Sequence, residues 1–573
     1  MDNITVLFSD VNTMWVLIGA ALVFFMQAGF AMVETGFTRS KNAGNIIMKN
    51  LMDFSIGTPL YWLTGFGIMF GTQSSIFGGL YFFGSGLGED FLPAGVSYYA
   101  FFIFQTVFCA TAATIVSGAM AERTKFSAYC CYSAAISLLI YPVSGHWIWG
   151  GGWLADLGFH DFAGSTAVHM LGGVAAIVGA KMLGARIGKY DKNGKSRAIP
   201  GHSITLGALG VFILWFCWFG FNGGSTVAFT DGAAEVASVV FFNTNLATAV
   251  ATVTTMIVTW IRYKKPDVSM TLNGTLAGLV AITAGCDAVN PMGAAAIGLC
   301  AGIAVVFGIE FIDKVLKIDD PVGAAGVHGL NGALGTLLTA VFATSEYLEG
   351  AEMTRLEFLG IQAIGVVAVI AWTAIAMSII FFIIKKTIGL RVSAQEEIDG
   401  LDMHEHGLVN AYADFLLSDD ESVALMSEAG IVTGSVSSDE AVPVMVKTEA
   451  TSVASDMPIS RVEILMRKDR FETLKIEMMK IGITGMTVTN VLGCGTQGTT
   501  KFYRGVETTV DLKPKVQVEI VVCKVPVSEV VAVAKKVLYT GNIGDGKIFI
   551  SGVDNVVKIR TGEEGCDALQ DVE

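Results

Sequence analysis

Long apolar stretches fill the first 385 residues of the chain, and they constrain its fold more than any other feature. Hydrophobic residues make up 53% of the 573 residues and charged residues only 15%, whereas soluble domains carry about 25% charged residues. An α-helix needs about 20 apolar residues to cross a bilayer. The sequence therefore predicts a polytopic α-helical protein embedded in membrane lipid. The eleven predicted transmembrane helices are 12–36, 44–72, 98–121, 127–144, 163–186, 203–222, 236–261, 270–286, 291–311, 324–344 and 358–384.

Basic residues are concentrated in every second loop between these spans. They follow the odd-numbered spans, as Arg39, Arg123 and the run 189–197 illustrate, whereas the alternate loops hold almost none apart from Arg355. Lys and Arg close to membrane spans stay mostly on the cytoplasmic side. This pattern predicts a multi-pass protein of the cell (inner) membrane, with its N-terminus outside and everything after residue 386 in the cytoplasm.

Two stretches at predicted spans carry an aspartate and, eight residues later, a histidine. DFAGSTAVHMLGG places Asp161 ahead of His169 at the fifth span, and DDPVGAAGVHGLNG places Asp320 ahead of His328 at the tenth. If spans one to five and six to ten are two copies of one unit, the odd number per copy inverts the second. Inverted repeats commonly place a transport site at their interface. The sequence thus predicts a five-plus-five inverted repeat with the two histidines facing each other.

These four residues leave alternatives open. A lone histidine in an apolar helix is often a core residue, but an ionisable residue inside a membrane indicates function. Two neutral imidazoles can share one hydrogen bond and remain uncharged in a dry channel. A metal site would need further ligands near His169 or His328, so no metal is expected in the membrane domain. Asp161 and Asp320 precede predicted helix starts, where carboxylates cap free N–H groups; the alternative is a role in drawing a cation into the site.

Aromatic residues gather near the same spans. FFIFQTVF (101–108) lies in the third span, HWIWGGGW (146–153) precedes Asp161, and WFGFNGGS (218–225) ends the sixth span. Aromatic faces attract desolvated cations, although such residues also form ordinary belts at membrane interfaces.

With these motifs the chain resembles the ammonium transporters of the Amt/Mep/Rh family over about residues 11–412. The matching stretches follow the family's order and end in a tail segment, GLDMHEHGLVNAY (400–412). The resemblance implies ammonium as substrate and a homotrimer with one pore per subunit. It also implies several residue roles. They are Phe108 and Phe221 as outer gate, Trp149, Ser225 and Phe108 as ammonium recruitment site, and His169 and His328 as pore lining.

Physical chemistry supports such a pore. A bare ammonium ion entering an apolar pore costs on the order of tens of kcal/mol in a simple Born picture, whereas neutral ammonia costs far less. An outer aromatic site binds the cation, a proton is removed, and the narrow pore admits neutral ammonia. The linked histidine pair then either hydrogen-bonds the ammonia or relays the proton. Potassium has no removable proton and is rejected. An alternative is an ammonium sensor that signals with little transport. No nucleophile–base arrangement is present, so no catalytic residue and no enzymatic activity are expected.

The remainder of the chain reads as soluble. An acidic stretch, 413–457, predicts a linker between the membrane domain, 1–412, and a second domain, 458–573. In the second domain, strand and helix patterns alternate as βαββαβ, which predicts an α+β, ferredoxin-like fold. The predicted order is strand 462–467, helix 470–482, strands 485–493 and 516–522, helix 528–539 and strand 547–553. The segment 493–515 is predicted to be a long loop.

This domain resembles the PII signal-transduction proteins, close to GlnK, over residues 459–569. GITGMTVT, PKVQVEIVV, IGDGKIF and KIRTGE carry the resemblance. It implies ATP or ADP bound between subunits of a trimer, with Mg²⁺ and 2-oxoglutarate as further ligands. The implied nucleotide-binding residues are Thr487, Gly495, Gln497, Gly546, Lys547, Lys558 and Arg560; Gln497 and Lys515 match positions for 2-oxoglutarate and Mg²⁺, and Arg504 matches the tip of the long T-loop.

The second domain departs from the PII pattern at two positions. The usual uridylylated tyrosine is Thr508, and Thr496 stands where many relatives have arginine near the phosphates. Nine scattered cysteines argue against a disulfide framework, and the net charge of −14 gives no support for a nucleic-acid partner. The sequence predicts an ammonium transporter regulated or sensed in cis by its own PII-like domain.

Overall fold

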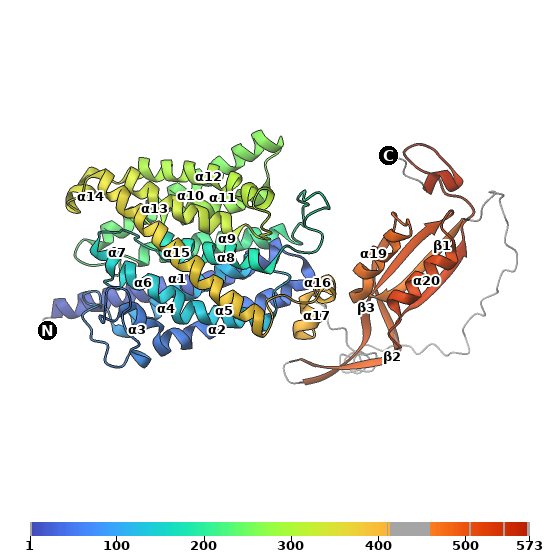
Figure 1. Cartoon of the computed structure of the whole chain (residues 1–573), viewed down its shortest axis with the longest axis horizontal. Coiled ribbons are helices and arrows are strands. Elements are labelled where there is room, and N and C mark those ends of the chain that lie inside the picture. Colours follow the sequence, from blue (N-terminus) through green and yellow to red (C-terminus); the bar gives the residue numbers. More distant parts are fainter. Residues whose placement is uncertain (1–2, 409–410, 413–458, 504–505, 542–544, 570–573) are drawn as a thin grey trace, which may run out of the picture. The chain divides into compact units, whose positions relative to one another are not determined.

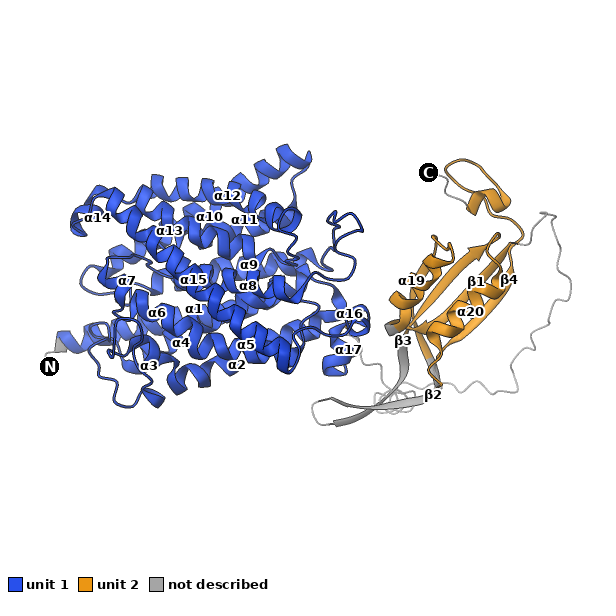
Figure 2. Ribbon diagram, viewed as in Figure 1, with its two compact units in different colours: residues 1–408 blue, residues 409–573 orange. Residues whose placement is uncertain are grey.

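The chain forms two compact units, residues 1–408 and 409–573 (Figure 2). This computed structural model describes residues 3–408, 411–412, 459–503, 506–541 and 545–569. Most of the predicted linker and the loop tip with Arg504 therefore lie outside the described residues. Unit 1 is entirely helical apart from isolated bridges, whereas unit 2 combines a sheet with helices (Figure 1).

Among the described residues, unit 1 contains nine helices long and apolar enough to cross a membrane. They are Ile4–Phe37, Tyr98–Ala119, Phe126–Asp156, Ser165–Leu183, Ile204–Gly223, Ala233–Tyr263, Pro291–Lys314, Ala325–Phe342 and Arg355–Thr387. The two other predicted spans correspond to a shorter apolar helix, α11 (Val268–Ile282), and to the consecutive helices α2 (Ala43–Leu60), η2 (Tyr61–Gly65) and α3 (Phe66–Phe70).

Five of these helices contain π-helical turns, which insert an extra residue and often occur at functional sites. Besides η2, they are η4 (Ile136–Ile140), η5 (Ser165–Met170), η6 (Phe219–Gly223) and η7 (Ala325–Leu330). The α-helices that carry or adjoin the site are α1 (Asn3–Phe37), α4 (Tyr98–Ala119), α5 (Phe126–Ala135), α6 (Tyr141–Trp149), α8 (Leu171–Leu183), α9 (Ile204–Trp218), α12 (Pro291–Lys314), α13 (Asn331–Phe342) and α15 (Arg355–Thr387).

Glycines allow the two histidine-bearing helices to touch through their backbones, as small residues do in membrane proteins. A Cβ atom added to Gly173 would overlap the amide nitrogen and Cα of Gly329. A Cβ atom added to Gly332 would lie 2.9 Å from the amide nitrogen of Met170. Gly173 follows His169 by four residues and Gly332 follows His328 by four. Each helix therefore contacts the other through the glycine four residues after its histidine.

A network of buried charges ties together the face of unit 1 that carries the basic loops. Glu122 pairs with Arg39 and with Arg186, and Arg186 also pairs with Asp319 at 2.9 Å. Burial raises the pKa of Asp319, but hydrogen bonding and the positive charge of Arg186 outweigh it and hold the pKa at about 2. Because removing one member of a buried pair is costly, the network fixes the ends of α1, α4, α8 and α12 relative to one another.

The tail that follows α15 packs against this same face. Helix α16 (Ala394–Asp399) and helix α17 (Leu401–His406) follow in order (Figure 1). The carboxylate of Asp402 accepts hydrogen bonds from the backbone N–H groups of Gly44 and Asn45 at the start of α2. The tail is therefore part of unit 1.

Unit 2 is built on one four-stranded antiparallel sheet in the order β2-β3-β1-β4. Val462 and Ile464 on β1 alternate with more exposed residues, as a sheet with one covered face requires. Leu474 and Val530 from the two helices join the same buried core. The elements are β1 (Ser460–Arg467), η9 (Lys468–Arg470), α19 (Phe471–Lys480), β2 (Thr487–Tyr503), β3 (Val506–Val522), α20 (Val527–Leu538), β4 (Lys547–Gly552) and η10 (Gly565–Leu569). The order is βαββαβ.

Two expectations for this domain are wrong. The segment 493–515 is not a loop: β2 and β3 continue as an antiparallel ribbon to Tyr503 and Val506, with an irregularity between Cys494 and Thr499. Its many β-branched residues favour extended strands. In addition, the scattered cysteines argued against disulfides, but Cys523 and Cys566 form a disulfide bond across 43 residues of sequence.

The contact between Gly173 and Gly329 yields a prediction about stability. Gly173→Ala leaves no room for the methyl group, and overpacking costs about 1–3 kcal/mol or more. We expect a lower thermal midpoint of the detergent-solubilised protein, measured by intrinsic fluorescence. Gly360→Ala on α15 is the matched control, because a Cβ atom there meets nothing within 4 Å. Equal midpoints for the two variants would contradict this account of the helix contact.

A second prediction concerns the face of unit 1 opposite the basic loops. There His160 Nε2 lies 3.0 Å from the Asp287 carboxylate, and each side chain is at most 20% exposed. Burial lowers the pKa of His160, but Asp287 raises it by more, and the net pKa lies above its ordinary value.

A histidine whose pKa is raised on folding stabilises the fold below its unfolded pKa, and this stabilisation is lost as pH rises through the folded pKa. Asp287→Asn should therefore destabilise the protein by about 1 kcal/mol near pH 6 and by less near pH 9. Thermal midpoints across this range provide the measurement. A destabilisation that does not change with pH would show that the ion pair does not contribute.

Candidate functional site

Two π-helical turns bring the histidines together in the middle of unit 1. His169 lies in η5 and His328 in η7, with exposed fractions of 0% and 4%. Their ring centroids are 5.3 Å apart and the rings are inclined by only 24°, so the rings stack. Residues 159 positions apart in the sequence thus form one buried pair.

The histidine pair does not share the hydrogen bond that the sequence suggested. Both ring nitrogens of His169 and Nδ1 of His328 lack a hydrogen-bond partner. Ring N–H bonds lie in the ring plane, and stacked rings do not direct them at each other. A buried polar atom without a partner costs about 1–3 kcal/mol, and such atoms in a native structure need an explanation. They are available to a small molecule that forms hydrogen bonds.

Asp161 and Asp320 hold the starts of the two histidine helices. The Asp161 carboxylate accepts hydrogen bonds of 2.8–2.9 Å from the N–H groups of four successive residues, 164–167. Asp320 accepts from Gly323 and Ala325 at 3.0 and 2.7 Å. Burial raises the pKa of Asp161, and these amides lower it only in part. With its oxygens directed at backbone amides, each carboxylate caps its helix.

Aromatic rings continue the line from the histidines toward the face that carries Trp149. Phe221 lies 5.3 Å from His169 between ring centroids, and Phe108 stacks on Phe221 at 4.2 Å. Trp149 meets Phe108 edge-on at 6.2 Å. Phe108 and Phe221 are 2% and 0% exposed, so they close the path, whereas Trp149 is half-buried. Ser225 Oγ donates to the Phe221 carbonyl at 2.8 Å.

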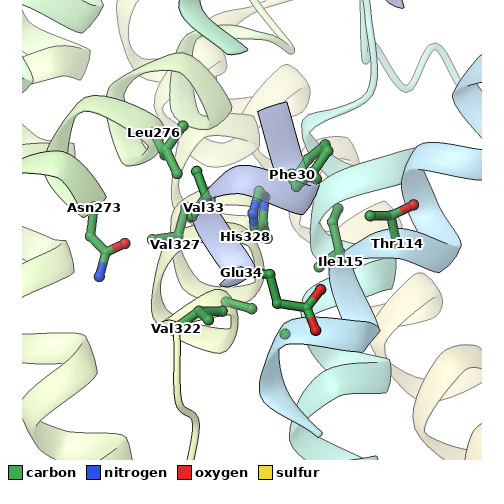
Figure 3. Close-up of a pocket in the computed structure, with 12 residues that line it drawn as sticks. Phe30, Val33, Glu34, Thr114, Ile115, Asn273, Leu276, Val322, Val327 and His328 are labelled. Carbon is green, nitrogen blue, oxygen red and sulfur yellow. The ribbon is translucent and has the colours of Figure 1, made fainter. Parts of the chain in front are cut away.

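A cavity of about 30 Å³ continues the line on the other side of His328 (Figure 3). About 10–15 Å³ suffices for one water molecule, so the cavity accepts one or two molecules of that size. Its polar residues are His328, Glu34, Thr114 and Asn273, and Oδ1 of Asn273 has no partner. Its apolar lining consists of Phe30, Val33, Ile115, Gly118, Leu276, Val322, Ala324 and Val327.

Sequence reasoning missed the buried charges beside this cavity. Glu34 is 4% exposed and accepts hydrogen bonds from Lys49 at 2.9 Å, from Asn50 at 2.9 Å and from Ser117 at 2.8 Å. Lys49 is 1% exposed, and its ammonium group lies 5.2 Å from the centre of the Tyr129 ring. Charged residues inside apolar spans were the signal that could have found them.

The predicted nucleotide-site residues of unit 2 lie at both edges of its sheet. Thr487 begins β2 at one edge, and Lys547 begins β4 at the other. Strands lie about 4.8 Å apart, so two intervening strands separate the two edges by roughly 14 Å. One copy of the domain therefore does not bring these residues together.

The remaining predicted residues of unit 2 divide into three groups. Gly546 has a φ of +125°, and a Cβ atom there would overlap the Leu465 carbonyl, so only glycine fits. Lys558 and Arg560 lie in the exposed segment after β4, and Lys515 lies on β3. Gly495 and Gln497 lie on β2, but the side chain of Gln497 and all of Arg504 lie outside the described part of the chain. The Lys558 ammonium group lies 3.6 Å from the Glu563 carboxylate, and its side chain is 16% exposed.

Comparisons with known proteins match each of the two units to a protein family. Residues 14–411 match the Ammonium Transporter Family and residues 459–563 match Nitrogen regulatory protein P-II. Ammonium transporter Amt2 of Archaeoglobus fulgidus is 45% identical over 441 residues, which cover 73% of this chain and 92% of that protein. Putative ammonium transporter sll1017 of Synechocystis sp. is 42% identical over 402 residues, covering 69% and 88%.

Solved structures are similar over the membrane part. A protein titled Sensor Amt Protein has a TM-score of 0.66 and 43% identity, and the match covers 71% of this chain and all of that one. Candida albicans Mep2 has a TM-score of 0.61 and 28% identity, with 68% and 87% covered. The chain belongs to the ammonium transporter family and carries a C-terminal PII domain.

Proposed function

We propose that unit 1 binds ammonium at Trp149, passes its proton to the histidine pair, which relays it across, and conducts ammonia past the stacked histidines to the cavity beyond His328, so that transport moves net charge. The observation that carries this proposal is the unbroken line of side chains from Trp149 through Phe108 and Phe221 to His169 and His328. The outer part of this line is aromatic and suits a cation. Its centre is buried and offers unpartnered ring nitrogens, which suit a small neutral molecule that forms hydrogen bonds.

The energetics favour passage of the neutral form. The two phenyl rings exclude water, and a bare cation between them would lose its hydration without gaining a counter-charge. Ammonia carries no charge and can exchange hydrogen bonds with the free nitrogens of His169 and His328. Potassium has a similar size to ammonium but no proton to release. The same barrier therefore excludes it.

We further propose eleven spans arranged as a five-plus-five inverted repeat, with the N-terminus outside and unit 2 in the cytoplasm. The reciprocal contacts of Gly173 and Gly332 support a two-fold relation between the histidine helices. Both histidines lie in π-helical turns, and both helices start at a capping aspartate. The basic loops on one face support the orientation.

Unit 2 is proposed to bind ATP or ADP between subunits of a homotrimer, with Mg²⁺ and 2-oxoglutarate as further ligands. The support is the separation of Thr487 and Lys547 at opposite edges of the sheet, which a neighbouring copy can bridge. Gly546, Lys547, Lys558 and Arg560 would hold the phosphates. The match of Arg504 to the tip of the T-loop stays a prediction, as does a role for Lys515 toward 2-oxoglutarate or Mg²⁺.

A second candidate function is an ammonium sensor. It is favoured by the 43% identity to the structure titled Sensor Amt Protein, which is matched over its whole length. In that case unit 1 binds ammonium and signals through unit 2 with little flux. Ammonium-dependent current across proteoliposomes distinguishes the two functions, because a sensor produces none.

The histidine pair gives the central test of the transport proposal. His169→Ala with His328→Ala removes the ring nitrogens and opens the centre of the path to water. We expect ammonium-dependent current to fall at least tenfold, or to persist with a new potassium current. Solid-supported membrane electrophysiology on proteoliposomes measures both ions.

His202→Ala is the matched control, because His202 lies before α9 and its Nδ1 bonds to the Thr38 carbonyl rather than to the path. Its currents should equal those of the unchanged protein. Unchanged ammonium current and potassium exclusion in the double variant would remove the histidines from the mechanism.

Regulation in cis is tested by comparing the full chain with residues 1–412. The match to Amt2 of Archaeoglobus fulgidus covers 92% of that protein but only 73% of this chain. A membrane part without unit 2 is therefore expected to fold by itself. We expect ATP, ADP or 2-oxoglutarate to change the current of the full chain at least about twofold and to leave that of 1–412 unchanged. Identical responses of the two proteins would rule out regulation by unit 2.

A further inference from the structure

The disulfide bond between Cys523 and Cys566 joins two very different parts of unit 2. Cys523 directly follows β3, which lies inside the sheet, and Cys566 lies in η10 near the end of the described chain. Their Cα atoms are 5.8 Å apart, within the usual range for a disulfide. Both residues are half-buried rather than enclosed, so small thiols and disulfides can reach them.

The core of the domain does not depend on this bond. Among the described residues, the fully buried residues of unit 2 run from Ile459 to Leu538, and none follows β4. The last backbone hydrogen bond from the sheet to the following segment is from Val553 N–H to the Ile459 carbonyl, at 3.0 Å. Opening the disulfide therefore leaves the buried core of the sheet and helices intact.

The segment 554–566 is a short hairpin that carries two of the proposed phosphate-binding cations. Val557 pairs with Glu564, and the Lys558 and Gly565 N–H groups donate to the Glu563 and Val556 carbonyls at 2.8 and 2.9 Å. The hairpin is exposed, with Ile559 completely so. One end of it continues from β4 and the other end is fixed by Cys566.

We propose that Cys523 and Cys566 form a reversible oxidation site that controls how firmly the hairpin with Lys558 and Arg560 is held, and hence how tightly unit 2 binds a nucleotide polyphosphate. The nucleotide part of this inference rests on the function proposed above. With the disulfide closed, both ends of the hairpin are fixed and its cations are held in place. With the disulfide open, one end is free, and binding must order the hairpin.

The reaction is a thiol–disulfide exchange with a low-molecular-weight disulfide as oxidant. One cysteine thiolate attacks the small disulfide, breaks its S–S bond and releases one thiol. The second cysteine then attacks the resulting mixed disulfide, forms the Cys523–Cys566 bond and releases the second thiol. Two protein thiols are oxidised, and one small disulfide is reduced to two thiols. Disulfides in the cytosol are usually transient and redox-sensing, which fits the proposed location of unit 2.

The first test follows the thiols and the hairpin in the full chain in detergent. Glutathione and glutathione disulfide are mixed in varied ratios, and alkylation with mass spectrometry counts free Cys523 and Cys566. We expect both to close and reopen together. Hydrogen exchange of peptides within 554–566 should be at least about tenfold faster in the reduced protein, because one end of the hairpin is released. Exchange that is equal in the two states would overturn the proposal.

The second test measures ATP and ADP affinity by calorimetry in both redox states. In the reduced protein, binding must also order the hairpin and its two long side chains, so reduction should weaken binding roughly tenfold. Cys566→Ser should behave as the reduced protein under all conditions. Cys131→Ser is the matched control, because Cys131 is a free, exposed cysteine on α5, and it should keep the redox response.

The outcomes separate the two proposals. Equal nucleotide affinity in both redox states, with reversible closure of the disulfide, would overturn the coupling to the nucleotide. Absence of nucleotide binding in either state would reject the proposed ligand and the coupling together, whereas thiol titration and hydrogen exchange would still decide whether the hairpin is switched. Nucleotide binding with a disulfide that never reopens in glutathione would reject the switch alone.

Discussion

The backbone contact between the two histidine helices is the constraint on which the membrane part depends. Helices with ordinary side chains at Gly173 and Gly332 could not approach closely enough to stack His169 on His328. The capping carboxylates of Asp161 and Asp320 then fix where each helix begins, and the π-helical turns set the direction of each ring. A site made of two stacked rings in an apolar interior needs this rigidity, since neither ring nitrogen of His169 has a hydrogen-bond partner among the described residues that would hold the ring in place.

The sequence was sufficient for features that depend on local pattern. The length of the apolar stretches located the helices of unit 1, and the alternation of apolar and polar residues located the strands of unit 2. Both patterns follow from which side chains an element of that type buries. The repeated aspartate–histidine spacing located the central pair. Features that depend on packing between distant segments were not predictable. The stacked geometry of the rings, the Glu34–Lys49 pair across α1 and α2, and the Cys523–Cys566 bond each require knowing which segments meet.

Two of the buried charge clusters in unit 1 have different kinds of partner. On the basic face, Arg186 joins Glu122 and Asp319, and the pKa of Asp319 falls to about 2, which indicates carboxylates held firmly in their charged form. Beside the cavity, Glu34 is matched by Lys49 and by neutral donors. A carboxylate balanced in this way limits the field that it projects into the cavity. The cavity beside His328 can thus be polar without binding cations strongly.

The sheet of unit 2 explains why the two halves benefit from being one chain. Its proposed ligand-binding residues lie at opposite edges, so the proposed site would form only where copies meet edge to edge. A membrane part that assembles as a trimer would hold three copies of unit 2 at a high effective concentration. Weak contacts between their edges would then suffice, and a ligand that strengthens those contacts would report its presence to the pore. Within this scheme the exposed hairpin after β4 is the part that can lose its order at the lowest cost in folding free energy, because it contributes no described residue to the buried core.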